Sequence, residues 1–520
     1  MNPEATRRPR ASRIPFLVAL LGGSVLLSRV LGLVREMVLA AELGAGAEVD
    51  AYRAAFQVPD ILFHFLSGGA FAVAFVPFYT RIRETRGDAA AERLLAVGFG
   101  TMAVVSALAT AGLWIWAEEL VALQFPRFAP ETQALTVRLT RIVLPAQIFF
   151  VTGGVLRAAL MANDRFAPQA LAPLVYNAGI IAGGVLGARA MGAEGFAWGA
   201  LAGAVVGPFL LPLLDLRRAG LRLRFRFAPF DRDFLAYLWR AAPLILGMSL
   251  LTVDEWYDKW FGGLLGEGAV AQIGYARMPM LVPVGLIGQA VATAALPALS
   301  QLASEGRREE LDRTLLSILR ASLTLAVVLA AGTLALAEPG VALLFERGRF
   351  TAEDSAGVAS ILVVFCLGVP GWVIQQVAGR GFYAREDMWR PMLLSTAVAL
   401  LAIPLYLELG ERFGSQGIAG AGALAMSVSA LCLLLFLRVL HGGPRLTPLI
   451  GALGRALLVA LPAGVAAGWA ASLVQTPWAG CLLGGAAFAI VAIPGLWTLG
   501  DEATREVVRG AVGKLFGRRG

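Results

Sequence analysis

The sequence contains few charged residues for its length. Only 15% of its 520 residues are Asp, Glu, Lys or Arg, whereas soluble domains carry about 25%. Hydrophobic residues make up 58% of the chain, and the mean hydropathy is +0.71. A soluble protein of this composition could not cover its own surface with polar groups. The composition therefore excludes an ordinary soluble domain and indicates that lipid surrounds much of the chain.

Histidine and cysteine are also scarce, with two and three residues respectively. The cysteines, Cys366, Cys432 and Cys481, lie inside apolar runs without metal-ligand spacing, so we interpret them as small buried hydrophobic residues. The sequence has no Walker loop, zincin motif, nucleophile elbow or kinase signature in a position to act. We therefore expect no enzymatic activity, no firmly bound metal and no cofactor.

Apolar windows of about 20 residues recur along the whole chain. They predict an all-α, polytopic membrane protein with about fourteen transmembrane helices. The connecting loops are too short to hold a separate catalytic domain. The expected helices are 15–42, 51–82, 91–116, 134–161, 168–188, 194–215, 234–262, 268–303, 313–336, 356–384, 390–409, 416–438, 452–473 and 479–499.

Basic residues gather in alternate connections between these helices, which explains the net charge of +8 better than nucleic-acid binding does. By the positive-inside rule, both termini are predicted to lie in the cytoplasm. We expect two parallel six-helix lobes followed by two extra helices. The predicted parts are a cytoplasmic N-terminus (1–14), a first lobe (15–233), a second lobe (234–445), helices 13 and 14 (446–500) and a basic cytoplasmic tail (501–520).

The two lobes are predicted from an internal repeat at an offset of about 220 residues. Six helices per copy is an even number, so both copies would run through the membrane in the same direction. Transporters use such parallel repeats to place a substrate site between two lobes. The motifs that match are Ala74–Pro77 with Ala294–Pro297, Arg157 with Arg380, and Gly195–Ala197 with Gly417–Ala419.

Charged side chains lie deep in the predicted helices, where each costs roughly 2.5–3.5 kcal/mol on insertion scales. Arginine suits phosphate because its planar fork can bind two oxygens. The functional interpretation is a hydrated cationic cavity between the lobes that binds a phosphate or diphosphate. The alternative is that the charges pair with one another and only fix helix packing. The candidate substrate-binding residues are Arg29, Arg35, Glu36, Asp50, Arg53, Gln57, Asp60, His64 and Arg277.

Two groups of these candidates carry more specific expectations. Residues 53, 57, 60 and 64 have helical spacing, which predicts that they share one face of the second helix. The acidic cluster of the seventh helix could bind a coupling cation or pair with the lysine beside it, and both interpretations stay open. That possible ion-coupling group is Asp254, Glu255, Asp258 and Lys259.

Several motifs resemble the MurJ/MviN family of the multidrug/oligosaccharidyl-lipid/polysaccharide exporter superfamily. They occur in the family's order across about residues 20–450. These motifs are Ser28–Glu36, Gly44–Gly46 with Asp50–Ala51, Gly69–Phe71, Ala74–Pro77, Asn163–Phe166, Ala172–Pro173, Leu344–Thr351 and Gly381–Asp387. The resemblance implies a bacterial inner-membrane flippase that moves lipid II, an undecaprenyl-diphosphate-linked peptidoglycan precursor, by alternating access.

The resemblance also assigns residues. The family's cavity arginines correspond to Arg29 and Arg35, and its acidic position after the first helix corresponds to Asp50. The chain departs from the family at Phe63–His64 and Ser67–Gly69, at Glu36, and at Met278, where the family's arginine position has moved to Arg277. Arg53, absent from the usual pattern, is expected to compensate.

The expected partners are a polyprenyl-diphosphate-linked saccharide and membrane lipids, with no nucleic acid. We expect a monomer that associates with the cell-wall synthesis machinery. Coupling would use a monovalent cation or the membrane potential. The altered positions leave open another lipid-linked oligosaccharide, such as an exopolysaccharide or O-antigen unit. A cation-coupled small-molecule exporter would favour carboxylates over arginines, a membrane glycosyl- or acyltransferase would need a larger loop, and a scaffold would leave the charges mutually paired.

Overall fold

The computed structural model describes residues 14–66, 70–246 and 250–515. The predicted cytoplasmic N-terminus therefore lies almost entirely outside the described residues, as do Ser67–Gly69 and the last five residues of the predicted tail. Most of the described residues are helical, and there is no strand among them. The chain divides into two compact units, Met1–Gly247 and Met248–Gly520. The lobe boundary expected at 233/234 stays a prediction.

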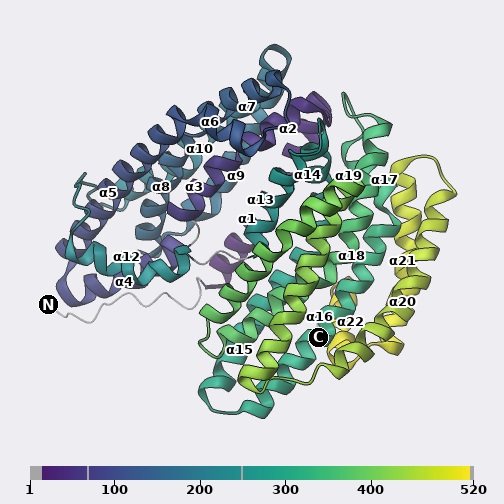
Figure 1. Cartoon of the computed structure of the whole chain (residues 1–520). Helices are drawn as coiled ribbons and strands as arrows, with labels where there is room; N and C mark the ends of the chain where they lie inside the picture. Colours follow the sequence, from purple (N-terminus) through teal and green to yellow (C-terminus); the bar gives the residue numbers. More distant parts are fainter. Residues whose placement is uncertain (1–13, 67–69, 247–249, 516–520) are drawn as a thin grey trace. The chain divides into compact units, whose positions relative to one another are not determined.

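Unit 1 contains all helices up to residue 246 (Figure 1). They are α1 (Ile14–Leu43), α2 (Ala47–Ala55), α3 (Gln57–Leu66), α4 (Ala70–Arg86), α5 (Asp88–Ile115), α6 (Ala117–Gln124), α7 (Pro130–Val143), α8 (Ala146–Met161), α9 (Ala167–Met191), α10 (Ala193–Ala204), the π-helical turn Val205–Leu210, α11 (Leu211–Arg218) and α12 (Arg232–Leu246). A buried core around Phe75, Val155 and Phe234 joins α4, α5, α8 and α12.

Unit 2 contains the remaining helices (Figure 1). They are α13 (Leu250–Gly262), α14 (Ala269–Pro283), the π-helical turn Val284–Gln289, α15 (Ala290–Ser304), α16 (Arg308–Ala335), α17 (Ala337–Phe345), α18 (Ala352–Tyr383), α19 (Trp389–His441), α20 (Thr447–Ser472), α21 (Pro477–Leu499) and α22 (Glu502–Leu515). One core joins α15, α16, α18 and α19, and a second joins α16 to α20 and α21.

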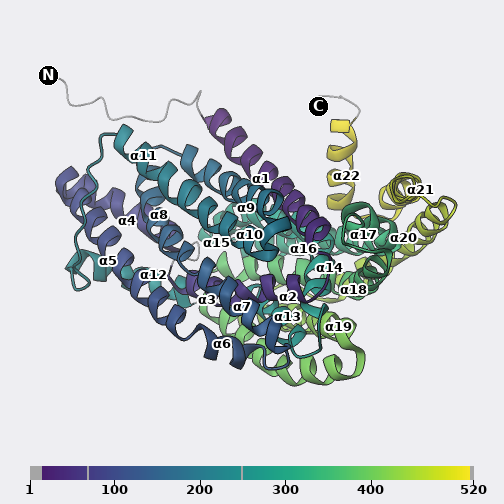
Figure 2. The same ribbon diagram turned by 90° about the horizontal axis from the view of Figure 1, so that it is seen from above.

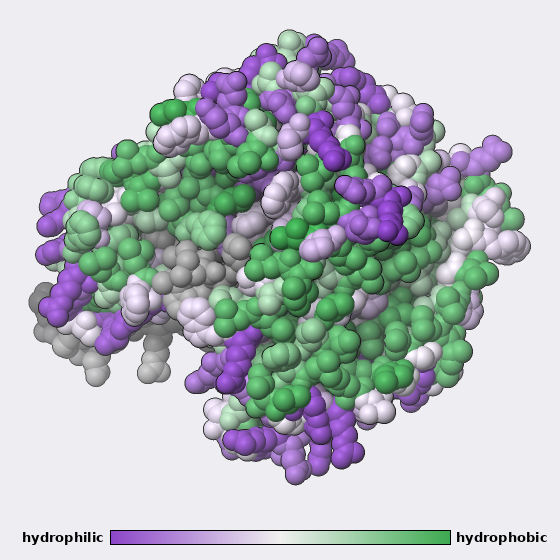
Figure 3. All heavy atoms as spheres, in the orientation of Figure 1, coloured by the Kyte–Doolittle hydropathy of each residue, from purple (hydrophilic) through white to green (hydrophobic). Residues whose placement is uncertain are grey.

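The apolar composition of the helices appears on their outer surfaces. Leu186 is 84% exposed, Leu401 79% and Ile490 73%. In Figure 3 apolar residues gather along the sides of the helices, and hydrophilic residues gather near their ends. Among the described residues, ten helices are long and apolar enough to cross a membrane. The all-α, polytopic membrane class is therefore confirmed, whereas the count of fourteen spans stays a prediction.

The expected helix 51–82 differs from the structure because the chain leaves one helical axis at Phe56 and forms α2 and α3 in its place. Pro59 has no backbone N–H to donate to the Ala55 carbonyl, and its ring would clash with that carbonyl in a continuous helix. Arg53 consequently lies on α2, whereas Gln57, Asp60 and His64 lie on α3. The expectation that all four share one face of a single helix is wrong.

Helices α9 and α10 lie side by side in unit 1, with backbones in close approach (Figure 2). A Cβ at Gly199 would lie 2.5 Å from the Gly179 carbonyl oxygen, and one at Gly183 would lie 2.4 Å from the Gly195 carbonyl oxygen. Glycine at every fourth position removes the side chains that would keep the helices apart. The stripe consists of Gly179, Gly183 and Gly187 on α9 and Gly195, Gly199 and Gly203 on α10.

The internal repeat is visible in local conformation as well as in sequence. Helices α16 and α17 begin 220 positions after α5 and α6. Asp164 and Glu386, 222 positions apart, both have φ of 59°, an unusual value for residues other than glycine. Gly192 (φ 57°, ψ −134°) and Gly414 (φ 59°, ψ −138°) also match at this offset. The same chain breaks therefore recur in both units.

The loops that follow α8 and α18 carry side chains of opposite charge at equivalent positions, Arg165 and Asp387, which lie 222 positions apart. In unit 1 Arg165 donates through Nε to Asp215, at 2.9 Å. In unit 2 an acidic residue occupies the loop, and Asp387 Oδ2 lies 2.8 Å from His441 Nε2. Partial burial favours the protonated form of Asp387. Hydrogen bonds from His441 and Arg390 outweigh burial, so the pKa of Asp387 lies below its ordinary value.

Candidate functional site

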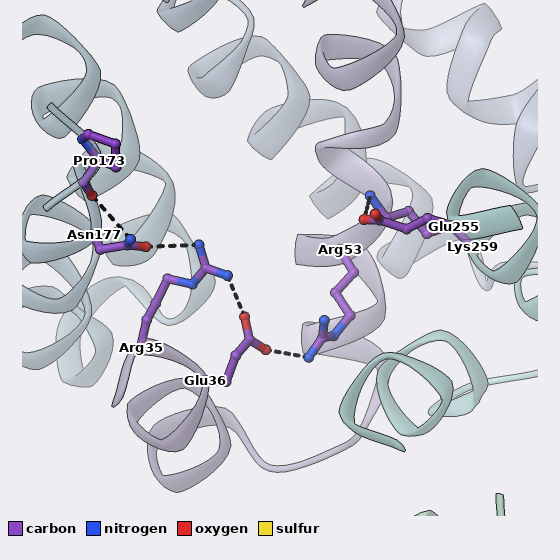
Figure 4. Close-up of polar contacts among 7 residues, drawn as sticks. All are labelled: Arg35, Glu36, Arg53, Pro173, Asn177, Glu255 and Lys259. Atoms are coloured by element: carbon purple, nitrogen blue, oxygen red, sulfur yellow. Dashed lines mark hydrogen bonds and ion pairs between the residues drawn. The ribbon is translucent and has the colours of Figure 1, made fainter. Parts of the chain in front are cut away.

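The polar centre of unit 1 is a group of four residues from three helices, which we call the Glu36 cluster: Arg35, Glu36, Arg53 and Asn177. Helix α1 supplies the first two, α2 supplies Arg53 and α9 supplies Asn177. Figure 4 shows the carboxylate of Glu36 between the two guanidinium groups. One carboxylate and two guanidinium groups therefore meet where α1, α2 and α9 come together.

Turn geometry brings Arg53 back to a residue that precedes it by 17 positions. Helix α1 ends at Gly44, whose φ of 77° is readily adopted only by glycine, and the chain then reverses into α2. Glu48 anchors α2 by accepting a hydrogen bond from the backbone N–H of Ala193, at 2.8 Å. That N–H is at the start of α10, where a carboxylate also interacts favourably with the helix dipole.

The hydrogen bonds of the Glu36 cluster use separate atoms for each partner. Arg35 Nη2 donates to Glu36 Oε1 at 2.8 Å, and Arg53 Nη2 donates to Oε2 at 2.5 Å. Arg35 Nη1 donates to Asn177 Oδ1 at 3.2 Å, and Asn177 in turn donates to the carbonyl of Pro173 at 3.1 Å. The Glu36 side chain is 5% exposed, whereas those of Arg35 and Arg53 are 28% and 15% exposed. A ligand can therefore reach the arginines more easily than it reaches the glutamate.

The other candidates of unit 1 are spread over three helices and differ in burial. Arg29 is on α1 with an exposed side chain, and Asp50 on α2 is fully buried. On α3, Gln57 is buried, and Asp60 and His64 are half-buried. A role of these five residues in substrate binding stays a prediction.

Unit 2 contains a separate group, which we call the Arg277 cluster: Asp254, Asp258, Arg277 and Tyr406. Arg277, on α14, pairs with Asp258 through Nη1 and with Asp254 through Nη2, the latter at 2.5 Å. The hydroxyl of Tyr406, on α19, donates to the other oxygen of Asp254 at 2.9 Å. All four side chains are buried. Two carboxyl groups therefore share one guanidinium group in this cluster.

The two open interpretations of the acidic residues on α13 separate in the structure. Glu255 pairs with Lys259 at 3.5 Å, as Figure 4 also shows, whereas Asp254 and Asp258 pair with Arg277. Among the described residues, no group of three or more His, Cys, Asp or Glu is arranged to hold a metal ion. Ion coupling by these residues stays a prediction.

Sequence reasoning missed two members of these clusters. Asn177 had a signal, since it is the one amide or charged residue between Gln169 and Arg189 in an apolar helix. Tyr406 had none, because a tyrosine in a membrane helix is equally compatible with packing or with the interface.

Comparison with known proteins identifies relatives over most of the chain. The sequence profile described as lipid II flippase MurJ matches residues 39–484. A probable lipid II flippase MurJ of Rhizobium meliloti (strain 1021) is 31% identical over 426 residues, which cover 80% of this chain and 79% of that protein. The lipid II flippase MurJ of Burkholderia cenocepacia is 29% identical over 431 residues, which cover 80% and 82%.

Solved structures support the fold. A lipid II flippase MurJ in an inward closed conformation has a TM-score of 0.77 at 21% identity and covers 92% of this chain and 99% of its own. An inward-facing multidrug resistance MATE family transporter of the MOP superfamily has a TM-score of 0.67 at 15% identity, with 80% and 94% covered. At these identities the structural likeness establishes the fold alone. The profile match and the relative above 30% identity establish more: the chain belongs to the lipid II flippase MurJ family.

Proposed function

We propose that this protein is a flippase that moves lipid II from the cytoplasmic to the outer leaflet of the bacterial inner membrane by alternating access. The observation that carries the proposal is the Glu36 cluster, in which Arg35 and Arg53 converge on one anionic group. Paired arginines on membrane helices suit the diphosphate of a prenyl-linked saccharide, because each can donate two parallel hydrogen bonds to phosphate oxygens. Family membership supports the same substrate class.

The protein would act as a transporter without a chemical step. The arginines would bind the diphosphate head at the cytoplasmic side, and the prenyl tail would stay in lipid. We further propose that both termini lie in the cytoplasm, that the protein works as a monomer near the cell-wall synthesis machinery, and that transport is coupled to a monovalent cation or the membrane potential. The basic connections support the orientation through the positive-inside rule.

Complementation of a conditional lipid II flippase mutant tests the substrate. The intact chain is expected to restore growth, and Arg35→Ala is expected to abolish rescue at equal expression. Leu401→Ala is the control: it removes a side chain that is exposed on the surface of unit 2 and should leave rescue unchanged. Failure of the well-expressed intact chain to restore growth would overturn lipid II as the substrate.

A second candidate substrate is another polyprenyl-diphosphate-linked oligosaccharide, such as an exopolysaccharide or O-antigen unit. The observation that favours it is the pair Phe63–His64, which takes the place of two cations expected from the family resemblance. Both side chains are half-buried on α3. Rescue of a strain that lacks the corresponding oligosaccharide flippase, without rescue of the lipid II flippase mutant, would favour this candidate.

A further inference from the structure

Glu36 holds two arginines in the way that an oxyanion ligand would. Its two carboxylate oxygens each accept from a different guanidinium, at 2.8 and 2.5 Å. A phosphate group also presents oxygens from a single centre to neighbouring donors, and arginine forks bind carboxylate and phosphate with similar geometry. Glu36 therefore uses the Nη2 donors that a diphosphate would need.

The charges indicate direct competition between Glu36 and an anionic ligand. Arg35, Glu36 and Arg53 together carry one formal positive charge, whereas the two arginines alone would carry two. A diphosphate that approached both arginines with Glu36 in place would meet a buried carboxylate of like charge, since the Glu36 side chain is 5% exposed. Like charges at short range in a poorly solvated site repel strongly.

The arginines also need Glu36 when no ligand is present. Unpaired guanidinium groups are unfavourable on membrane helices, because a charge removed from water needs a counter-ion. Asn177 holds Arg35 through Nη1, a different atom from the Nη2 that binds Glu36. Arg35 can therefore stay anchored while its Nη2 exchanges one anion for another.

We propose that Glu36 is a resident anion: it binds Arg35 and Arg53 while the site is empty, and the diphosphate of the substrate displaces it. This inference rests on the proposed function and adds a cycle of anion exchange to it. The glutamate lowers the affinity for the diphosphate, and its return to the arginines promotes release of the product. Glu36 thus acts on transport through the two arginines, as a positioning residue.

Binding of a prenyl diphosphate to the purified full-length protein tests the exchange. Farnesyl diphosphate serves as the probe, and its affinity is measured in detergent for the wild type, Glu36→Gln and Glu36→Gln/Arg53→Gln. Glutamine keeps the shape and one acceptor but not the charge. The expected result is at least tenfold tighter binding by Glu36→Gln, equal to about 1.4 kcal/mol, with the gain lost in the double variant. Equal or weaker binding by Glu36→Gln would overturn the proposal, because a purely structural carboxylate would leave the arginines misplaced.

A matched control separates local exchange from a general change in charge. Asp215→Asn removes a carboxylate that pairs with Arg165 at the end of α11, and it should leave the affinity unchanged. A gain as large in this variant would also overturn the proposal. If Glu36→Gln does not fold, as judged by thermal unfolding, Glu36→Asp provides the second test. Aspartate is one methylene too short to reach both arginines at once, so this variant is expected to bind the probe tighter than wild type, and unchanged binding would count against the exchange.

Transport distinguishes this inference from the proposed function itself. In proteoliposomes that contain lipid II, Glu36→Gln is expected to lower the apparent KM and kcat together, because binding improves and release slows. If wild type moves lipid II but Glu36→Gln raises KM, the resident anion is wrong and the flippase stands. If wild type does not move lipid II but Glu36→Gln still binds farnesyl diphosphate more tightly, the substrate assignment is wrong and anion exchange stands.

Discussion

Replacement of Arg277 by methionine tests whether the Arg277 cluster is a structural brace of unit 2. Methionine occupies a similar volume but carries no charge, so Asp254 and Asp258 would remain buried without their shared guanidinium. In the wild type the residues Asp254 and Asp258 are 1% and 4% exposed, and Arg277 is 8% exposed. Water therefore cannot replace the lost partner without a change in packing.

The expected loss of stability follows from the electrostatics. A pair of unit charges about 4 Å apart contributes about 4 kcal/mol at an effective dielectric constant of about 20. Removal of one partner from a buried ion pair costs about 3–5 kcal/mol, because the other charge is left uncompensated. At roughly 2–4 °C for each kcal/mol in a unit of this size, Arg277→Met should lower the melting temperature by about 10 °C.

Thermal unfolding of the purified protein in detergent measures this loss. A triple variant that combines Arg277→Met with Asp254→Asn and Asp258→Asn removes all three charges, and Tyr406 can still donate to the amide oxygen at position 254. The triple variant is expected to recover at least half of the lost stability and to retain transport. A melting temperature of Arg277→Met equal to that of wild type, with transport abolished, would refute the brace and support the substrate-binding interpretation of Arg277.

Three further outcomes are expected. Gly199→Ala should destabilise unit 1 by about 1–3 kcal/mol through overpacking. Gly454→Ala is the control: a Cβ there meets nothing within 4 Å, so this variant should be as stable as wild type or more stable. Equal melting temperatures for the two variants would show that the close approach of α9 and α10 is not required. Asp387→Asn should lower the free energy of unfolding by about 1 kcal/mol at neutral pH. This difference from wild type should vanish as the pH falls below about 4 and through the lowered pKa of Asp387, because only the charged carboxylate pairs favourably with His441. Unfolding curves of the two proteins that stay apart at low pH would contradict this. Arg29→Ala should leave folding intact and reduce lipid II transport at least tenfold in proteoliposomes, and unchanged transport would remove Arg29 from the site.

Most of the helices could be predicted from the sequence, because lipid imposes a strong one-dimensional pattern. A helix that crosses the hydrocarbon core needs about 20 apolar residues in succession, and those runs are recognisable without knowledge of their neighbours. The expected span 479–499 corresponds to α21, Pro477–Leu499, and the span 168–188 lies within α9. The expected spans 390–409 and 416–438 correspond to α19, which contains a non-helical residue at Gly414 between them.

The breaks within helices were harder to predict. The helical axis changes at Phe56, three residues before Pro59, yet the helices continue past Pro370 and Pro404. Neighbouring helices, side chains and local adjustments can satisfy the carbonyl that a proline leaves without its donor. A proline in a membrane helix therefore signals a possible break, and the surrounding packing determines whether the axis changes.

The sequence by itself determined that this is an all-α membrane protein and that its family is recognisable. It also determined that charged residues lie on α1 and α13. Only the tertiary structure decided which charges meet. Arg35 and Arg53 both pair with Glu36, whereas Arg277 pairs with Asp254 and Asp258. The reason is physical: hydropathy depends on composition along the chain, but an ion pair depends on side-chain direction and on turns such as those at Gly44 and Phe56. Residues far apart in sequence become partners only when such turns bring their helices together.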